Sequence, residues 1–160
     1  MAKKGGGSGS KATSLPAGEH WRDEPEDHDY PAAAAYLSLL CPPPEVKRLV
    51  ASLRAAPLEH RLAKDLLRAS RLALLPADNP HVATDLAKVK AGERLSPVLL
   101  VRGDVSRDVP MTIADGYHRV CASYHLDENA PIPCHLAAPG TTRSRDLSWT
   151  RSSRSPTAVQ

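Results

Sequence analysis

Phenylalanine is absent from this chain of 160 residues, which holds only two tryptophans and four tyrosines. The hydrophobic core must therefore be built mainly from Leu, Val, Ile and Ala, and segments rich in Leu and Ala favour helices over a β-sandwich. Long apolar runs are also lacking, because none approaches the roughly 20 residues that span a bilayer. The Gly- and Lys-rich start has no apolar stretch of the kind found in a secretory signal. We therefore expect a cytoplasmic protein that does not cross a membrane.

Cysteine is scarce and follows no binding pattern. Cys41, Cys121 and Cys134 are an odd number of thiols without a Cys-x-x-Cys spacing. The sequence therefore indicates neither a disulfide framework nor a zinc site built on cysteines. We interpret all three as reduced thiols, which agrees with a cytoplasmic protein.

The body of the chain lacks an excess of positive charge. The net charge is +3, but residues 1–11 carry +3 and residues 140–160 carry another +3, which leaves −3 for residues 12–139. A basic protein often binds nucleic acid through a positively charged surface. Here only the basic tails offer such a surface, so we expect any contact with nucleic acid to run through them.

Composition divides the chain into four parts. Residues 1–18 are rich in Gly, Ser and Lys and are expected to form a flexible tail, and residues 138–160 a disordered basic tail. Residues 19–73 predict a helical N-terminal extension, and residues 74–137 predict the main domain. The extension is expected to hold three helices, at residues 31–40, 44–56 and 58–71.

Strand and helix patterns mix in residues 74–137. The continuous apolar run at 97–101 is typical of a strand covered on both faces, and residues 110–114 are its expected hairpin partner. The chain is therefore expected to form an α+β fold, a small mixed sheet with helices. The other expected elements are an edge strand at 72–75, helices at 81–90 and 117–126, and a strand at 131–136.

Acids and histidines are dense in residues 19–30. Asp27, His28 and Asp29 could serve as ligands for a hard metal ion, but adjacent ligands without a partner cluster make a poor metal signature. We favour the alternative, an acidic, solvated approach to the next helix. In that interpretation Asp29 is the N-cap and Pro31 takes the first helical position.

The segment Thr112–Ala122 carries the strongest functional signal. A short apolar run meets an Asp115-Gly116 break, and the apolar residues that follow have the spacing of one helix face: Tyr117, Val120, Cys121 and Tyr124. We therefore predict a strand, a tight turn and a helix. A helix N-terminus presents unpaired backbone N–H groups and favours anions such as phosphate.

This D-G-x-H-R turn resembles the helix-entry motif of the ParB-like domain, a superfamily that joins the N-terminal domains of chromosome-partition proteins with the sulfiredoxins. The Pro-led strand at Ser96-Pro97-Val98, the Asn79-Pro80-His81 helix start and the closing Ile-Pro strand add to the likeness, which covers about residues 74–136. The resemblance implies a ParB/sulfiredoxin-like fold whose turn lies against a nucleotide phosphate.

Two departures limit what the resemblance implies about chemistry. Sulfiredoxins place their nucleophilic cysteine between the Gly and the His of the motif, where this chain has Tyr117. A phenol with a pKa near 10 cannot replace a thiolate, so sulfinic-acid reductase activity is not expected. Partition proteins carry Glu-Arg-Arg after the Gly, and here the acid and the first Arg are absent. The phosphate-binding geometry is therefore what carries over.

Three residues of the turn each have a functional role and a structural alternative. Gly116 lets the backbone turn sharply and approach a ligand, or is an ordinary turn glycine. Asp115 is a candidate Mg²⁺ ligand, or satisfies N–H groups of the turn. Arg119 offers a fork for phosphate, or forms a salt bridge to a neighbouring acid.

His118 is the candidate catalytic residue, as a general acid–base or a donor to phosphate, with a structural hydrogen bond as its alternative. Tyr117 and His81 complete the predicted nucleotide- or phosphate-binding set, and His81 is expected to face the same site.

We therefore predict a protein that binds a nucleotide or another phosphorylated small molecule, with Mg²⁺ accompanying the nucleotide. If the protein is an enzyme, the expected class is a nucleotide hydrolase or phosphotransferase. The alternatives are a non-enzymatic DNA-associated or regulatory module that uses the basic tails, and a protein-interaction scaffold whose site is degenerate.

Overall fold

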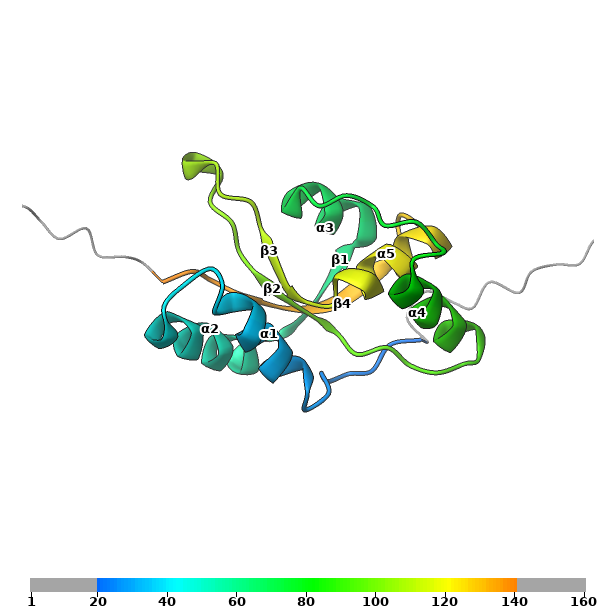
Figure 1. Ribbon diagram of the computed structural model, residues 1–160, viewed down its shortest axis with the longest axis horizontal. Helices are drawn as coiled ribbons and strands as arrows, with labels where there is room; N and C mark the ends of the chain where they lie inside the picture. The colour runs from blue at the N-terminus through cyan, green and yellow to red at the C-terminus, as the bar shows by residue number, and fades with distance from the viewer. Residues whose placement is uncertain (1–19, 141–160) are drawn as a thin grey trace, which may run out of the picture.

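The computed structural model describes residues 20–140 (Figure 1). Four strands form one sheet in the order β1-β4-β2-β3. Central strands β4 and β2 run parallel, and both outer pairs are antiparallel. The strands are β1 (Leu58–Leu62), β2 (Val98–Val101), β3 (Thr112–Asp115) and β4 (Pro131–Ala137).

The predicted α+β class with a small mixed sheet is confirmed, and so is the β2–β3 hairpin. The predicted tail at residues 1–18 lies outside the described residues, and so does the predicted tail at 138–160 except for residues 138–140.

Helices cover both faces of the sheet (Figure 1). On one face lie α1 (Asp29–Leu37) and α2 (Pro43–Ala55), and on the other lie α3 (Ala63–Ser70), α4 (Pro80–Lys90) and α5 (Tyr117–Leu126). A short 3₁₀ turn, Val105–Arg107, forms the tip of the β2–β3 hairpin. Among residues 20–140, no helix has the length and apolar content that crossing a membrane requires.

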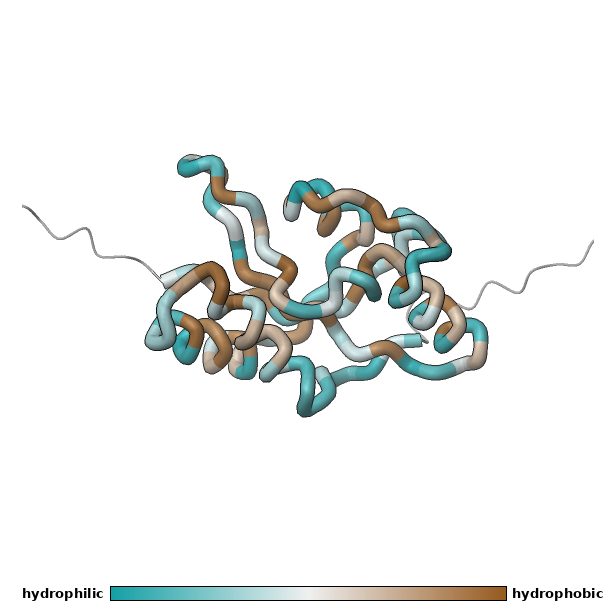
Figure 2. The backbone as a smooth tube through the Cα atoms, in the orientation of Figure 1, coloured by the Kyte–Doolittle hydropathy of each residue, from teal (hydrophilic) through white to brown (hydrophobic). Residues whose placement is uncertain are grey.

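The side chains of β2 alternate between two hydrophobic cores. Val98 and Leu100 pack with α3, α4 and α5, while Leu99 and Val101 pack with α1 and α2, because successive strand residues point to opposite faces. All four are buried, so the predicted strand covered on both faces is confirmed. Figure 2 shows hydrophobic segments in the strands between the helices, while the hairpin tip and the loop before α1 are hydrophilic.

The apolar stripes predicted for the helices are confirmed where they face these cores. The inward residues of α2, α4 and α5 that the structure buries are Leu49, Leu53, Val82, Val89, Val120 and Cys121. Segments 19–73 and 74–137 share both cores, because α1 and α2 pack against β2, β3 and β4. The helical extension is therefore part of the same folded body as the predicted domain.

The helix predicted over residues 58–71 is wrong in its first third. Leu58–Leu62 is strand β1, which pairs antiparallel with β4, and α3 begins only at Ala63. Leu58 and Leu62 happen to continue the spacing of the apolar residues in α3, so the sequence pattern indicates a helix where the structure has a strand. Backbone N–H and C=O groups along β4 need partners, and β1 supplies them. Its polar centre, residues 59–61, suits a strand at the edge of a sheet.

The edge strand predicted at residues 72–75 is also wrong, because β1 and β3 hold both edges of the sheet. The segment instead crosses the outer side of α5. The Tyr117 hydroxyl donates a hydrogen bond to the carbonyl of Ala73, and His125 Nε2 lies 2.7 Å from the carbonyl oxygen of Leu75. Backbone groups of this connection are thus satisfied by side chains and not by a sheet.

Replacing the fully buried Leu53 of α2 with Ala is expected to lower the free energy of unfolding by about 2–5 kcal/mol, because the change leaves a cavity. The matched control is Leu39→Ala, at a side chain that is 79% exposed, which should change it by less than about 0.5 kcal/mol. Denaturant titration measures both. Equal effects would show that α2 does not pack on the sheet in solution.

Candidate functional site

The turn between β3 and α5 is built around Gly116. Its φ of 101° lies in the left-handed region that favours glycine. A Cβ atom at this position would lie 2.6 Å from Val98 Cγ1, so the turn packs directly on β2. The predicted strand, tight turn and helix are confirmed, with Asp115 ending β3 and Tyr117 beginning α5.

The first turn of α5 offers free backbone donors. No described side chain caps it, and its backbone ladder starts with the Val120 N–H donating to the Gly116 carbonyl. The N–H groups of Tyr117, His118 and Arg119 are therefore those that a helix leaves without an internal partner. Such a turn, with the positive end of the helix dipole, attracts an anion.

Two histidines meet beside this turn. His81, in the first turn of α4, and His118, in the first turn of α5, have ring centroids 4.6 Å apart. Burial lowers the pKa of His118, and the charge of His81 lowers it further, whereas Asp85 opposes the shift. His118 is therefore mainly neutral near pH 7, with one ring N–H to donate. The structure thus brings together two of the predicted site residues that lie on different helices.

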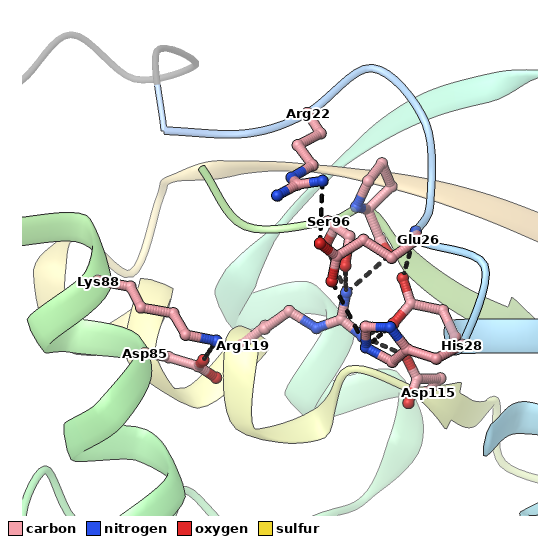
Figure 3. Close-up of polar contacts among 10 residues, drawn as sticks. Arg22, Glu26, His28, Asp85, Lys88, Ser96, Asp115 and Arg119 are labelled. Atoms are coloured by element: carbon pink, nitrogen blue, oxygen red, sulfur yellow. Dashed lines mark hydrogen bonds and ion pairs between the residues drawn. The ribbon is translucent and has the colours of Figure 1, made fainter. Parts of the chain in front are cut away.

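Arg119 is the centre of a buried network (Figure 3). Its guanidinium forms ion pairs with Asp115 and, at 3.3 Å, with Asp29 Oδ1. It also donates to the carbonyl oxygens of Ser96 at 2.7 Å and Pro97 at 3.2 Å. Only 12% of the side chain is exposed. Both terminal nitrogens of Arg119 bond within the protein, so the structure shows the salt bridge that was the alternative to a phosphate fork.

The two carboxylates on Arg119 have opposite pKa shifts. Burial alone would raise the pKa of Asp29, but the Arg119 charge and hydrogen bonds from Ser96 and the Glu26 backbone outweigh it, so the pKa is lowered. Burial raises the pKa of Asp115, Arg119 opposes this, and the charge of Asp29 adds to it. Asp115, the predicted Mg²⁺ ligand, is here an ion-pair partner of Arg119 beside a second carboxylate.

The prediction of Asp29 as a solvated N-cap is wrong. α1 begins at Asp29, with His28 at the N-cap position, and the Asp29 side chain is only 3% exposed. Its Oδ2 accepts the N–H of Glu26 at 2.8 Å, and its Oδ1 faces Arg119. The Asp29 carboxylate is buried because the buried guanidinium of Arg119 requires a counter-charge. That partner lies 90 positions away in the sequence, where no local pattern records it.

A polar pocket of about 240 Å³ opens over this network. Asp85, a lining residue that sequence reasoning missed, comes from α4, and burial raises the pKa of its carboxyl. It stands four residues after His81, one helical turn on along the same face, and this spacing is the signal that could have indicated it. The charges of His118 and His81, together with those of Lys88 and Arg119, oppose this rise in the pKa of Asp85. The pocket and the histidine pair are therefore electrostatically linked.

The group of possible metal ligands in the structure differs by one residue from the group considered from the sequence. The structure brings Glu26, and not Asp27, close to His28 and Asp29, with one potential ligand atom from each within 4.8 Å of the others. His28 and Asp29 are thus placed together as that interpretation required.

The thiols supply no nucleophile at this site. Cys121 is fully buried on α5, and burial raises the pKa of its thiol. Burial also raises the pKa of Cys134, to about 11. A thiol that stays protonated at neutral pH is a poor nucleophile. The interpretation of the cysteines as free thiols agrees with the structure.

No family model, curated protein or solved structure matches this chain. The resemblance of the D-G-Y-H-R turn to the ParB-like domain therefore stays a prediction, carried by the motif and its place between β3 and α5.

Gly116→Ala is expected to destabilise the protein more than Gly92→Ala. Both glycines have positive φ, 101° and 80°, but a Cβ at Gly92 meets nothing within 4 Å, whereas one at Gly116 meets Val98. We expect a loss of about 1 kcal/mol for Gly92→Ala from backbone strain alone, and about 2–4 kcal/mol for Gly116→Ala. Denaturant titration separates the two. Equal losses would mean that Val98 moves aside without cost.

Proposed function

We propose that this protein binds a nucleotide or another phosphorylated small molecule at the first turn of α5. The observation that carries the proposal is the meeting of two kinds of donor at one place. Free backbone N–H groups of Tyr117, His118 and Arg119 lie in an uncapped helical turn, and the paired rings of His81 and His118 lie beside them.

A phosphate group suits this arrangement chemically. Its oxygens accept several hydrogen bonds at once, from the helix N–H groups and from an imidazole N–H. The dipole of α5 adds the equivalent of about half a positive charge at this end.

Arg119 supports the site without contacting the phosphate. By holding Asp115, which precedes the turn, and the carbonyls of Ser96 and Pro97, which precede β2, it fixes where α5 begins. In this proposal Arg119 is a positioning residue. The phosphate is bound by backbone N–H groups and by the two histidines, with His118 also placed for proton transfer should the phosphate react.

His118→Ala and His81→Ala are each expected to weaken binding of the best nucleotide by about 10–100-fold, since a hydrogen bond to a charged group is worth about 1.5–3 kcal/mol. Isothermal titration with ATP, CTP and GTP, with and without Mg²⁺, identifies that nucleotide. Inorganic pyrophosphate tests whether phosphate alone suffices.

The control is His60→Ala, which removes an exposed histidine from β1 and should leave binding unchanged. The proposal fails if none of these ligands binds, or if His118→Ala binds as tightly as the unaltered protein.

Affinity for the phosphate is expected to rise as the pH falls from about 8 to about 6. The lowered pKa leaves His118 mainly neutral in the free protein, whereas a bound anion favours the imidazolium and raises that pKa. Binding therefore takes up a proton, and mass action strengthens it at lower pH. Titrations at several pH values should show a steeper dependence for the unaltered protein than for His118→Asn, which removes the His118 imidazole and leaves His81 and the ligand unchanged. Identical slopes would contradict a role for the imidazole.

A further inference from the structure

We infer that Glu26, His28 and Asp29 form a binding site for a first-row divalent cation, with Zn²⁺ the best fit, at the edge of the polar pocket. This site lies in the loop before α1 and the start of that helix, not at the α5 turn. It goes beyond the proposed phosphate-binding function and does not rest on it.

The distances between the potential ligand atoms carry the inference. His28 Nε2 lies 3.4 Å from Glu26 Oε2 and 3.6 Å from Asp29 Oδ1. Zinc bonds of about 2.1 Å at the tetrahedral angle separate two ligand atoms by about 3.4 Å. The two separations from His28 therefore match an edge of a zinc coordination tetrahedron, and one potential ligand atom from each of the three residues lies within 4.8 Å of the others.

Both distances exceed the usual limit of about 3.2 Å for a bond from N–H to oxygen. They are the distances of ion pairs that a protonated His28 forms with the two carboxylates. The His28 side chain is 76% exposed, so packing does not force it towards them. A metal ion between the three atoms would take the place of the proton on His28 Nε2 and bind all three atoms at once.

The remaining oxygens of both carboxylates are already held. Asp29 Oδ2 accepts the Glu26 backbone N–H at 2.8 Å, and Glu26 Oε1 pairs with Arg22 at 2.9 Å. Glu26 therefore presents its other oxygen, Oε2, towards His28 (Figure 3). Asp29 Oδ1 lies 3.6 Å from His28 Nε2 and 3.3 Å from the Arg119 guanidinium. Such supporting bonds orient metal ligands in proteins.

Local charge also favours a cation. Three carboxylates, those of Glu26, Asp29 and Asp115, share two guanidinium groups, those of Arg22 and Arg119. One formal negative charge is left over in this partly buried region. That charge attracts a divalent cation, which would not have to displace either arginine.

The ligand set selects the kind of ion. Mg²⁺ and Ca²⁺ prefer oxygen ligands only, whereas an imidazole nitrogen with two carboxylates suits Zn²⁺ and its first-row neighbours. Three protein ligands leave a fourth position for water or for a ligand oxygen. That position would face the pocket, which all three residues line.

Isothermal titration of the full chain with Zn²⁺, in buffer free of phosphate and nucleotide, tests the site. Glu26→Gln and His28→Ala are each expected to weaken Zn²⁺ binding by about tenfold or more, since even residues that only orient a metal ligand cost about 10–100-fold. Co²⁺ in place of Zn²⁺ should give visible absorption of a tetrahedral site, and His28→Ala should abolish it.

Two matched variants serve as controls. Asp27→Asn removes an equal charge next to His28, and His60→Ala removes an exposed imidazole elsewhere. Both should bind Zn²⁺ as the unaltered protein does. Circular dichroism checks that every variant is folded, which the exposure of His28 leads us to expect.

The inference is overturned if Glu26→Gln and His28→Ala bind Zn²⁺ unchanged, or if the control variants weaken binding equally. The second result would show that Zn²⁺ binds nonspecifically to acids and histidines on the surface. Because the titration contains no phosphate, its outcome is independent of the proposed function.

Discussion

The ion-pair network of Arg119 is the interaction on which the site depends. One guanidinium links Asp29 of α1, Asp115 of the β3–α5 turn and the backbone before β2. It thereby joins a helix on one face of the sheet to a helix on the other. A buried charge that loses its partner costs about 3–5 kcal/mol, so the three segments are held to one arrangement. The geometry of both proposed sites is a consequence of this constraint.

The network also divides the chemical roles among neighbouring residues. Arg119 has the charge that a phosphate would seek, but both of its terminal nitrogens bond within the protein. In the proposed function, anion binding therefore falls to the backbone of α5 and to His118 and His81. On the other side of the network, Asp29 is buried by its pairing with Arg119. This pairing holds the Asp29 carboxylate in place, and Glu26 and His28 lie beside it.

Features governed by near neighbours were predictable from the sequence. Apolar spacing located α2, α4 and α5 and their buried faces, because helical packing repeats every few residues. The run Val98–Val101 indicated a strand buried on both faces, because β2 alternates between two cores. The Asp115-Gly116 break located the turn, since a left-handed φ is readily adopted by glycine. The identity of Tyr117 likewise argues against thiol chemistry at the turn, because a phenol does not replace a thiolate.

Features governed by distant partners were decided only by the tertiary structure. Leu58–Leu62 became a strand because β4 needed a partner along its edge, although its own spacing continued that of a helix. The sequence predicts Asp29 in solvent, but the residue is buried. Its counter-charge, Arg119, lies 90 positions later in the sequence and meets it only in the folded structure. The sequence by itself thus determined the local elements and the place of the turn that we propose binds an anion. Which acid meets which arginine, and which histidines meet each other, depended on how the sheet brings those elements together.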